Sequence, residues 1–299
     1  MKVILEPFPH CNIKCEFCCQ KEYKTSKSKL ELVNNTITTL KSLPLKNAEL
    51  SMWGGELFCW NDSKLLDKMK ELLDVDANVL TITSNFLFDT TDLLTYIEYA
   101  RSNGYSVNLS GSYDFWGRFT TKDQVNLFYN NVKDLDVTIE ILTTSLALKI
   151  LLNGTINKLG KYVIKIFEKL YETHRILFNL PTKYYTPSTY ELVRFYKYVN
   201  EKYPKHAFLK WYSCKTNLPV ECECFYEKDR YIIVNGELVQ GTCVDEFGSK
   251  DFIVQKFKER FKCDQCEYNI YCHSICVQKF FINDWDECFM KEIFRGMKW

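Results

Sequence analysis

Four of the fourteen cysteines in this chain of 299 residues stand within "PHCNIKCEFCC", residues 9–19. Cys11, Cys15 and Cys18 have the spacing C-x3-C-x2-C. Three thiolates on one short loop can hold three corners of a cubane iron–sulfur cluster and leave the fourth iron open to a substrate or cofactor. A structural zinc site needs a fourth ligand, for which Cys19 or His10 is available, and reactive thiols are a third interpretation. The spacing favours the open cluster.

A second set of nine cysteines falls between Cys214 and Cys288. The segment "CDQCEYNIYCHSIC" has the spacing C-x2-C-x5-C-x3-C, and one more cysteine follows it twelve residues later. Further cysteines precede this segment, in "ECECF" and at the end of a predicted hairpin. Two interleaved zinc sites are the alternative to iron–sulfur clusters here, and we expect His273 to be solvated or to support a ligand rather than to bind metal. The members of this set are Cys214, Cys222, Cys224, Cys243, Cys263, Cys266, Cys272, Cys276 and Cys288.

The elements that must position these cysteines alternate between strand-like and amphipathic stretches over residues 3–205. Such alternation predicts right-handed crossovers and a parallel sheet, either a complete barrel or, more in keeping with six units, an open three-quarter barrel. Ligand chemistry then belongs at the carboxyl ends of the strands. The predicted strands are 3–6, 49–53, 79–83, 106–109, 137–142 and 175–180, and the predicted helices are 30–43, 63–73, 91–102, 124–135, 158–173 and 188–201.

The pattern changes after about residue 205, where regular alternation stops. The stretch "DRYIIVNGELVQGTC" predicts a hairpin with Asn235 and Gly236 as its turn. We therefore expect two closely packed domains, an α/β partial barrel over residues 1–208 and a small cysteine-rich domain with a β-hairpin over 209–299.

The amino-acid composition excludes several classes of protein. The 39 basic and 38 acidic side chains nearly cancel, which argues against a dominant basic footprint for duplex DNA. No segment reaches the roughly 20 apolar residues that span a bilayer, and the N-terminus has no secretory signal. We expect a cytoplasmic protein without membrane contact, in which the cysteines serve as metal or cluster ligands rather than disulfides. The aromatic content of 15% indicates a core rich in Phe and Tyr.

The first cysteine motif resembles that of the radical S-adenosylmethionine (SAM) enzymes, C-x3-C-x-aromatic-C, with Phe17 at the aromatic position. After the second predicted strand, "SMWGGELF" contains Gly54, Gly55 and Glu56, which resemble the GGE element of that family. The family usually has proline next, where this chain has Leu57. The resemblance implies a partial (β/α)6 barrel, a [4Fe–4S] cluster on Cys11, Cys15 and Cys18, and a Glu56 carboxylate that holds the amino group of SAM, with glycines that let the backbone approach the ligand.

Weaker matches follow the third and fourth predicted strands, in "TITSN" and "NLSGSYDFWGR". The resemblance places Ser84 and Asn85 near the cofactor, and Ser110, Ser112 and Arg118 at the ribose and carboxylate of SAM. Asp114, in the same loop, is the candidate catalytic residue, as a proton acceptor or a substrate contact. Ordinary turn chemistry is the alternative for each of these residues.

The C-terminal cysteines resemble the SPASM extension of radical SAM enzymes, which carries two auxiliary [4Fe–4S] clusters. The family tends to have four residues between the hairpin glycine and the next cysteine, whereas six separate Gly236 from Cys243. Of the remaining cysteines, Cys214 could replace one ligand, and we expect it, Cys19 and Cys59 to act as small buried apolar residues. The resemblance assigns Cys263, Cys266, Cys272 and Cys288 to one cluster, and Cys222, Cys224, Cys243 and Cys276 to the other.

The resemblance implies an oxidoreductase that cleaves SAM reductively to a 5′-deoxyadenosyl radical and removes hydrogen from a substrate. We expect that substrate to be a peptide or protein, modified by cross-linking, epimerisation or oxidation. A small molecule, sugar or nucleotide is the alternative, and a non-catalytic zinc protein is a remote one. An electron donor such as flavodoxin or ferredoxin is an expected partner. Because the predicted barrel begins at residue 3, we also expect either a separate leader-peptide-binding protein or a short substrate. Nucleic acid is not an expected partner.

Overall fold

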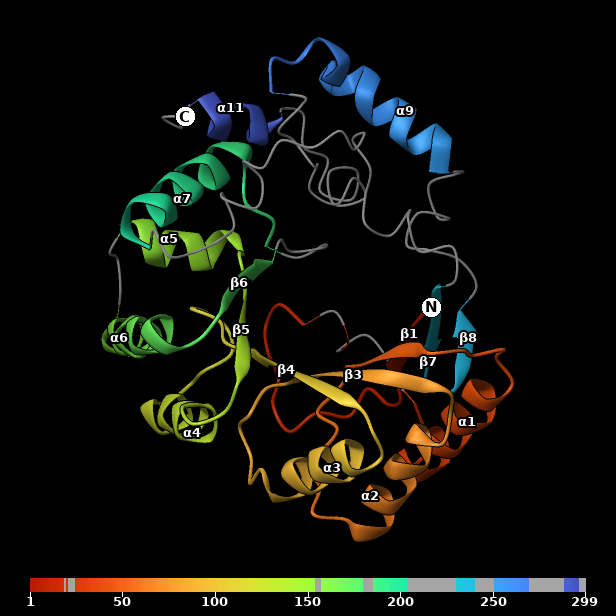
Figure 1. Cartoon of the computed structure of the whole chain (residues 1–299). Helices are drawn as coiled ribbons and strands as arrows, with labels where there is room; N and C mark the ends of the chain where they lie inside the picture. The colour runs from red at the N-terminus through yellow and green to blue at the C-terminus, as the bar shows by residue number, and fades with distance from the viewer. Residues whose placement is uncertain are drawn as a thin grey trace.

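A curved sheet of eight strands forms the centre of the protein in the computed structural model (Figure 1). The structure describes residues 1–18, 20, 25–153, 157–179, 185–203, 230–239, 250–268 and 288–295. The strand order is β6-β5-β4-β3-β2-β1-β7-β8, and every neighbouring pair is parallel except β7 and β8. The six strands predicted for the barrel are all present. The strands are β1 (Lys2–Glu6), β2 (Ala48–Met52), β3 (Ala77–Ser84), β4 (Ser106–Ser112), β5 (Val137–Leu142), β6 (Ile176–Asn179), β7 (Arg230–Val234) and β8 (Glu237–Val239).

The helices that follow strands β1 to β6 along the chain lie on the convex side of the sheet, so the expected strand–helix alternation is confirmed (Figure 1). Several begin at a side chain that accepts a hydrogen bond from the first turn, as Ser28, Asp62 and Ser188 do. The helices are α1 (Lys29–Lys41), α2 (Ser63–Lys70), η2 (Glu71–Leu73), α3 (Thr91–Ser102), α4 (Lys122–Val132), α5 (Ser145–Asn153), α6 (Lys158–Thr173), α7 (Thr189–Lys202), α9 (Lys250–Phe261), η5 (Cys263–Gln265) and α11 (Phe289–Arg295).

The two faces of the sheet differ in polarity. Leu50 on β2 pairs with Leu80 on β3, and both are completely buried beneath the helices. Their neighbours Ser51 and Thr81 also pair, on the opposite face, and are only partly buried. In a parallel sheet covered by helices on both faces, the strands have nearly continuous runs of apolar residues. Here β2 and β3 instead alternate between buried and partly buried residues. Along β2 and β3 the concave face is therefore more polar than the convex face.

Aromatic residues fill the core between the later strands and their helices, as the composition indicates. The Tyr113 ring lies 5.1 Å from that of Phe128, and the Phe178 ring lies 5.0 Å from that of Phe195. All four side chains are buried. The core therefore joins the ends of β4 and β6 to α4 and α7.

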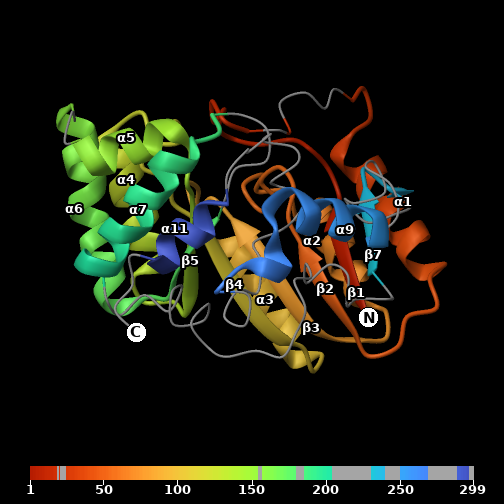
Figure 2. The ribbon, with the colours of Figure 1, turned by 90° about the horizontal axis from the view of Figure 1, so that it is seen from above.

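The C-terminal elements α9 and α11 lie on the concave side of the sheet, away from α2 and α3 (Figures 1 and 2). Helix α11 packs on α7, where the rings of Phe289 and Tyr196 stack with an angle of 7° between their planes. The C-terminal part is thus docked on the last helix of the barrel.

The hairpin of β7 and β8 forms where it is predicted and continues the barrel sheet. Its turn residues Asn235 and Gly236 have φ of 53° and 86°, the left-handed conformation that a two-residue hairpin turn requires. Strand β7 pairs in parallel with β1, and the Asn235 N–H donates to the Glu6 carbonyl at 2.8 Å. Thr39 of α1 donates its hydroxyl to the Gly236 carbonyl at 2.6 Å. The hairpin is therefore part of the sheet that carries the first cysteine loop.

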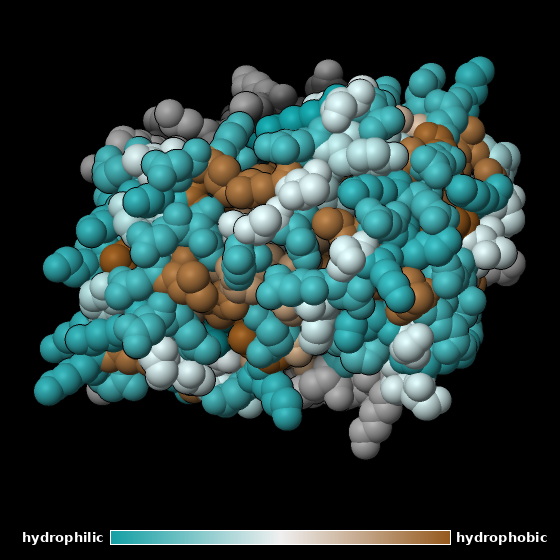
Figure 3. Space-filling view, turned by 90° about the horizontal axis from the view of Figure 1, so that it is seen from below, coloured by the Kyte–Doolittle hydropathy of each residue, from teal (hydrophilic) through white to brown (hydrophobic). Residues whose placement is uncertain are grey.

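The face of the molecule seen from below is mostly hydrophilic (Figure 3). In the view from below, polar side chains divide the apolar surface into separate patches (Figure 3). Isolated exposed residues such as Leu94 and Leu127 are normal for a protein surface. Among the described helices, none is both long and apolar enough to cross a membrane.

Replacing Ile233 of β7 by Ala tests whether the hairpin stabilises the barrel. Ile233 is completely buried, so its loss should lower the free energy of unfolding by about 2–5 kcal/mol. The matched control is Leu238→Ala in β8, which removes a side chain that is 37% exposed and should cost no more than about 0.5 kcal/mol. Urea unfolding of the full chain, followed by circular dichroism, measures both. Equal effects would show that the hairpin does not contribute to the stability of the sheet.

Candidate active site

The loop after β1 carries the three motif cysteines at the carboxyl end of the sheet. Cys15 is buried, Cys18 is half-buried and Cys11 is exposed. The Cys18 N–H donates to the Cys15 carbonyl at 3.2 Å. Burial raises the pKa of Cys15 to about 11; Arg118 lowers that pKa, whereas Asp114 and the thiols of Cys18 and Cys11 raise it further. The three thiols are therefore near neighbours on one loop.

These thiols do not converge on a common point. In the part of the chain that the structure describes, no group of three or more Cys, His, Asp or Glu side chains could hold a metal ion as it stands. The donor set nevertheless suits an iron–sulfur cluster, because soft thiolates are the ligands that such clusters use. Three thiols on one loop can close on a cluster by local rearrangement of the loop.

The turn after β2 packs its backbone directly against the cysteine loop. The Gly55 N–H donates to the Phe8 carbonyl at 3.1 Å, and the Glu56 N–H donates to the His10 carbonyl at 2.8 Å. A Cβ on Gly55 would lie 1.8 Å from the His10 carbonyl oxygen, and Gly54 has φ of 139°, which favours glycine. The sequence predicts that these glycines let the backbone approach a ligand. In the structure their lack of a side chain makes room for the backbone of the cysteine loop.

Glu56 is a buried carboxylate with one oxygen in use. Its Oε2 accepts hydrogen bonds from the Asn85 N–H at 2.7 Å and the Ser84 hydroxyl at 3.1 Å. Its Oε1 is also buried and has no hydrogen-bond partner among the described residues. Burial raises the pKa of Glu56 to about 7, against the lowering effect of the Asn85 N–H, the Ser84 hydroxyl and, less strongly, the nearby N–H groups of Phe58 and Leu57, neither of which makes a hydrogen bond to Oε1. A buried acceptor without a partner is costly, so this position fits a cationic donor such as an ammonium group.

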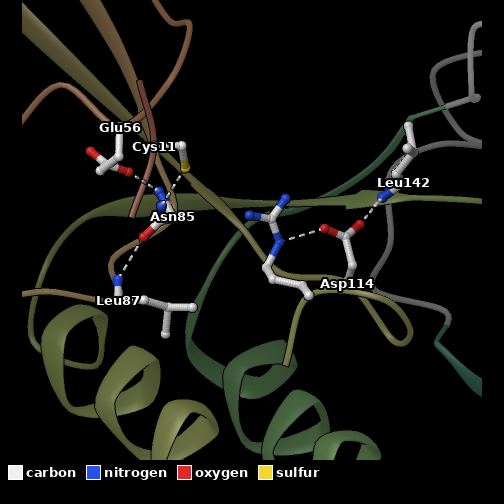
Figure 4. Close-up of polar contacts among 7 residues, drawn as sticks. Cys11, Glu56, Asn85, Leu87, Asp114 and Leu142 are labelled. Atoms are coloured by element: carbon white, nitrogen blue, oxygen red, sulfur yellow. Dashed lines mark hydrogen bonds and ion pairs between the residues drawn. The ribbon is translucent and has the colours of Figure 1, made fainter. Parts of the chain in front are cut away.

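Asn85 connects Glu56 to the cysteine loop (Figure 4). Its side-chain nitrogen donates to Asn12 Oδ1 at 2.8 Å and lies 3.7 Å from the Cys11 sulfur. Its side-chain oxygen accepts the Leu87 N–H at 2.8 Å. The sequence-predicted residues Ser84 and Asn85 thus lie in one network with Glu56 and Cys11.

Asp114 and Arg118 form a buried ion pair in the loop after β4 (Figure 4). Arg118 Nε donates to Asp114 Oδ2 at 2.7 Å, and the Leu142 N–H donates to Asp114 Oδ1 at 2.8 Å. Burial raises the pKa of Asp114, and Arg118 opposes that shift. Both oxygens of the carboxylate are engaged by groups of the protein itself. The sequence predicts Asp114 as a proton acceptor or a substrate contact. In the structure its carboxylate also joins Arg118 to the end of β5.

The same loop touches the cysteine loop at two places. The Glu16 N–H donates to the Gly117 carbonyl at 3.2 Å, and the Arg118 guanidinium lies 5.6 Å from the centroid of the Phe17 ring. Gly117 has φ of 80°, and a Cβ there would lie 3.0 Å from the Phe17 ring. The aromatic position of the cysteine motif is therefore a packing surface for the loop after β4.

Ser110 and Ser112 lie on the polar concave face. Ser110 pairs with Thr83 on one side and Thr138 on the other, and Ser112 pairs with Glu140. The Asn179 side chain donates to Glu140 Oε2 at 3.1 Å, next to this row. The two serines are placed to present hydroxyls to a group bound within the concave face.

Three residues next to the site were given no role in it by the sequence. Trp60 donates its ring N–H to the Glu56 carbonyl at 2.7 Å, and the Lys29 ammonium lies 4.0 Å from the centroid of its ring. Cys59, expected to be a small apolar residue, lies beside Glu56, and burial, then Glu56 and then Cys11 raise its pKa to about 12. Asn12, within the cysteine motif, could have drawn notice as a polar residue there. No sequence signal marks Trp60.

The second cysteine set is described only in part. Cys263 is buried, and Cys266 and Cys288 are half-buried. The Cys266 N–H donates to the Cys263 carbonyl at 3.0 Å, and Cys266 is close enough to raise the pKa of Cys288, which burial raises most. These three cysteines therefore share one region. The predicted ligands Cys222, Cys224, Cys243, Cys272 and Cys276 lie outside the described residues, as do Cys19, Cys214 and His273.

Comparison with known proteins identifies the fold. No protein-family model matches the sequence, and no curated protein matches it. Among solved structures, histidine-tagged anSMEcpe with bound AdoMet has a TM-score of 0.60 at 15% identity, covering 98% of this chain and 92% of that one. Native anSMEcpe with AdoMet and the Cp18Cys peptide has a TM-score of 0.57 at 14% identity, covering 93% and 89%. Streptococcus suis SuiB bound to its precursor peptide SuiA has a TM-score of 0.51 at 15% identity, covering 95% and 73%.

These structural neighbours are radical SAM enzymes with SPASM domains. At this level of identity the likeness concerns the fold. The chain has the radical SAM fold, an α/β partial barrel followed by a cysteine-rich region with a hairpin, as the sequence predicts.

Replacing Gly55 by Ala should displace the cysteine loop. The new methyl group would overlap the His10 carbonyl, and overpacking of this kind costs about 1–3 kcal/mol. Hydrogen exchange should become faster in peptides that contain residues 7–18. Gly104→Ala is the control: its Cβ would meet nothing within 4 Å, so only the cost of its φ of 86° applies, and that cost is local. Unchanged exchange over residues 7–18 in Gly55→Ala would contradict the packing described here.

Proposed function

We propose that this protein is a radical SAM enzyme that cleaves SAM reductively and removes a hydrogen atom from a peptide or protein substrate. The observation that carries the proposal is the buried Glu56 Oε1 without a partner among the described residues, held next to a three-cysteine loop in a radical SAM fold. A purely structural carboxylate in this position would be expected to have both oxygens bonded.

Cys11, Cys15 and Cys18 would hold a [4Fe–4S] cluster, and Glu56 would accept the amino group of SAM. When bound, the cluster supplies one electron, and SAM supplies the 5′-deoxyadenosyl group that takes hydrogen from the substrate. The chain contributes the orientation of these groups and the exclusion of water. Ser84 and Asn85 fix the carboxylate of Glu56 through its other oxygen, so that Oε1 remains available.

The remaining site residues have related roles in this proposal. Arg118 offers a guanidinium to the carboxylate of SAM, and Ser110 and Ser112 offer hydroxyls to its ribose. Buried aromatic side chains behind β4, Tyr113 and Phe128 among them, keep water from reaching the site through the sheet.

A peptide is the substrate that the structural neighbours support. Structures with a TM-score of at least 0.5 include anSMEcpe with the Cp18Cys peptide and SuiB with its precursor peptide SuiA. On β3, β4 and β5 the concave face presents polar side chains, such as Ser110 between Thr83 and Thr138, to which an extended chain can hydrogen-bond. We further propose that the C-terminal cysteines hold auxiliary [4Fe–4S] clusters, with Cys263, Cys266 and Cys288 in one of them, and that flavodoxin or ferredoxin supplies the electron.

Anaerobic reconstitution with iron and sulfide, followed by SAM and dithionite, tests the function. The protein should turn brown and release 5′-deoxyadenosine, measured by liquid chromatography and mass spectrometry. Cys15→Ala should abolish this product, because two thiols cannot secure the cluster, whereas Cys266→Ala should retain slow cleavage while losing peptide modification. Cys59→Ala, which removes a neighbouring thiol outside the motif, is the control and should retain cleavage. A fully loaded wild-type protein that forms no 5′-deoxyadenosine would overturn the proposal.

Replacing Glu56 by Gln should weaken the binding of SAM about 10- to 150-fold, because a hydrogen bond to a charged group contributes about 1.5–3 kcal/mol. Anaerobic equilibrium dialysis with labelled SAM measures the dissociation constant. The matched control is Glu49→Gln on β2, the strand that leads into this turn, whose carboxylate forms a partly exposed ion pair with Lys2 at 3.2 Å. Equal affinities in the two variants would exclude Glu56 as the group that binds the amine.

A further inference from the structure

The ion pair of Asp114 and Arg118 is almost completely buried, although burial does not make such a pair more stabilising. The side chains are 3% and 11% exposed, and the pair stands within the loop that packs on the cysteine motif. Removing two charges from water costs several kcal/mol per ion, which the attraction between them only partly offsets. A buried pair at this place therefore points to a use other than stability.

The pair is held from the β5 side. The Leu142 N–H, at the end of β5, donates to Asp114 Oδ1 at 2.8 Å, and the Tyr113 N–H donates to the Glu140 carbonyl at 2.8 Å. The loop is thus fixed to β5 by the Asp114 side chain and by the backbone of Tyr113, and Asp114 Oδ2 accepts a hydrogen bond from Arg118 Nε. This bond uses the Nε–H of Arg118 and involves neither of its two terminal nitrogens, whose N–H groups can donate to other acceptors.

The guanidinium lies on the cysteine loop. The guanidinium lies 5.6 Å from the centroid of the ring of Phe17, a residue that stands between Cys15 and Cys18 in the sequence. Next to Arg118, the Gly117 carbonyl accepts a hydrogen bond from the Glu16 N–H. The charge of Arg118 lowers the pKa of Cys15 and of Cys11, although burial raises both pKa values overall. The positive charge is therefore close to the thiols that would hold a cluster.

We propose that the two charges of the Asp114–Arg118 pair tune the reduction potential of the cluster, the guanidinium raising it and the carboxylate lowering it, and that Asp114 is not a catalytic base. The inference rests on the proposed function, because it needs a cluster on Cys11, Cys15 and Cys18.

The two charges should act on the cluster in opposite directions. Reduction adds one negative charge, which a nearby guanidinium stabilises and a nearby carboxylate destabilises, and in a buried site solvent screens these effects little. Loss of the Arg118 charge should therefore shift the potential to more negative values. Loss of the Asp114 charge, with the guanidinium retained, should shift it to more positive values. A residue with only a structural role would not produce shifts of opposite sign.

Redox titration of the full-length, reconstituted protein tests this inference, with electron paramagnetic resonance used to follow the signal that changes when SAM is added. The variants are Asp114→Asn, which can still accept the Leu142 N–H, and Arg118→Gln. The matched controls remove the same charges from exposed positions, Asp134→Asn and Arg101→Gln, and should leave the potential unchanged. Arg118→Lys keeps the charge and should stay close to the wild-type potential.

Opposite shifts in Asp114→Asn and Arg118→Gln would support the inference, and no shift or shifts of one sign would overturn it. If Arg118→Gln fails to hold a cluster, a positive shift in Asp114→Asn with little change in Arg118→Lys supports it, and an unshifted Asp114→Asn refutes it. A wild-type protein without a SAM-responsive signal would instead refute the proposed function. A base role for Asp114 predicts loss of substrate turnover in Asp114→Asn with the potential unchanged, which would likewise overturn the inference.

Discussion

The contact between the turn after β2 and the loop after β1 is the constraint on which the candidate site depends. Parallel neighbouring strands deliver both loops to the same edge of the sheet, and the absence of a side chain at Gly55 lets their backbones meet. That contact fixes Glu56 relative to the cysteines through the His10 carbonyl. Three groups from three different loops therefore lie close together: the Glu56 carboxylate, the Asn85 side-chain amide and the Cys11 thiol.

The difference in polarity between the two faces of the sheet determines where the other candidate binding residues lie. The convex face is apolar and packs on the barrel helices, so it provides the stability, while the concave face carries Ser, Thr and Glu side chains on β2 to β5. Binding groups can vary on the concave face without disturbing the core. The proposed binding residues on β4 and the loop anchored by Asp114 both belong to this polar side or its rim.

The fold could be predicted because its signals are local. Period-two strands and amphipathic helices appear in short windows of sequence, and Asn235-Gly236 marks a hairpin by itself. Helix α5 was missed because "SLALKILLN" is apolar on nearly all sides and shows no clear polar face. The contacts of Asn85 with Asn12 and of Asp114 with Leu142 join distant segments, so only the folded topology reveals them. The cysteine and GGE motifs could therefore be found, whereas the role of Asp114 could not.

The pairing of β7 with β1 also sets an order of assembly during synthesis. Lys2 pairs with Arg230, so β1 has an unfilled edge until the ribosome has made β7. Contacts between such distant segments form late, since a long loop must close first. The strand that leads into the cysteine loop thus gains its second neighbour only after the six barrel strands have been made. The loop that carries Cys11, Cys15 and Cys18 is accordingly fixed in its final surroundings only after the hairpin has been synthesised.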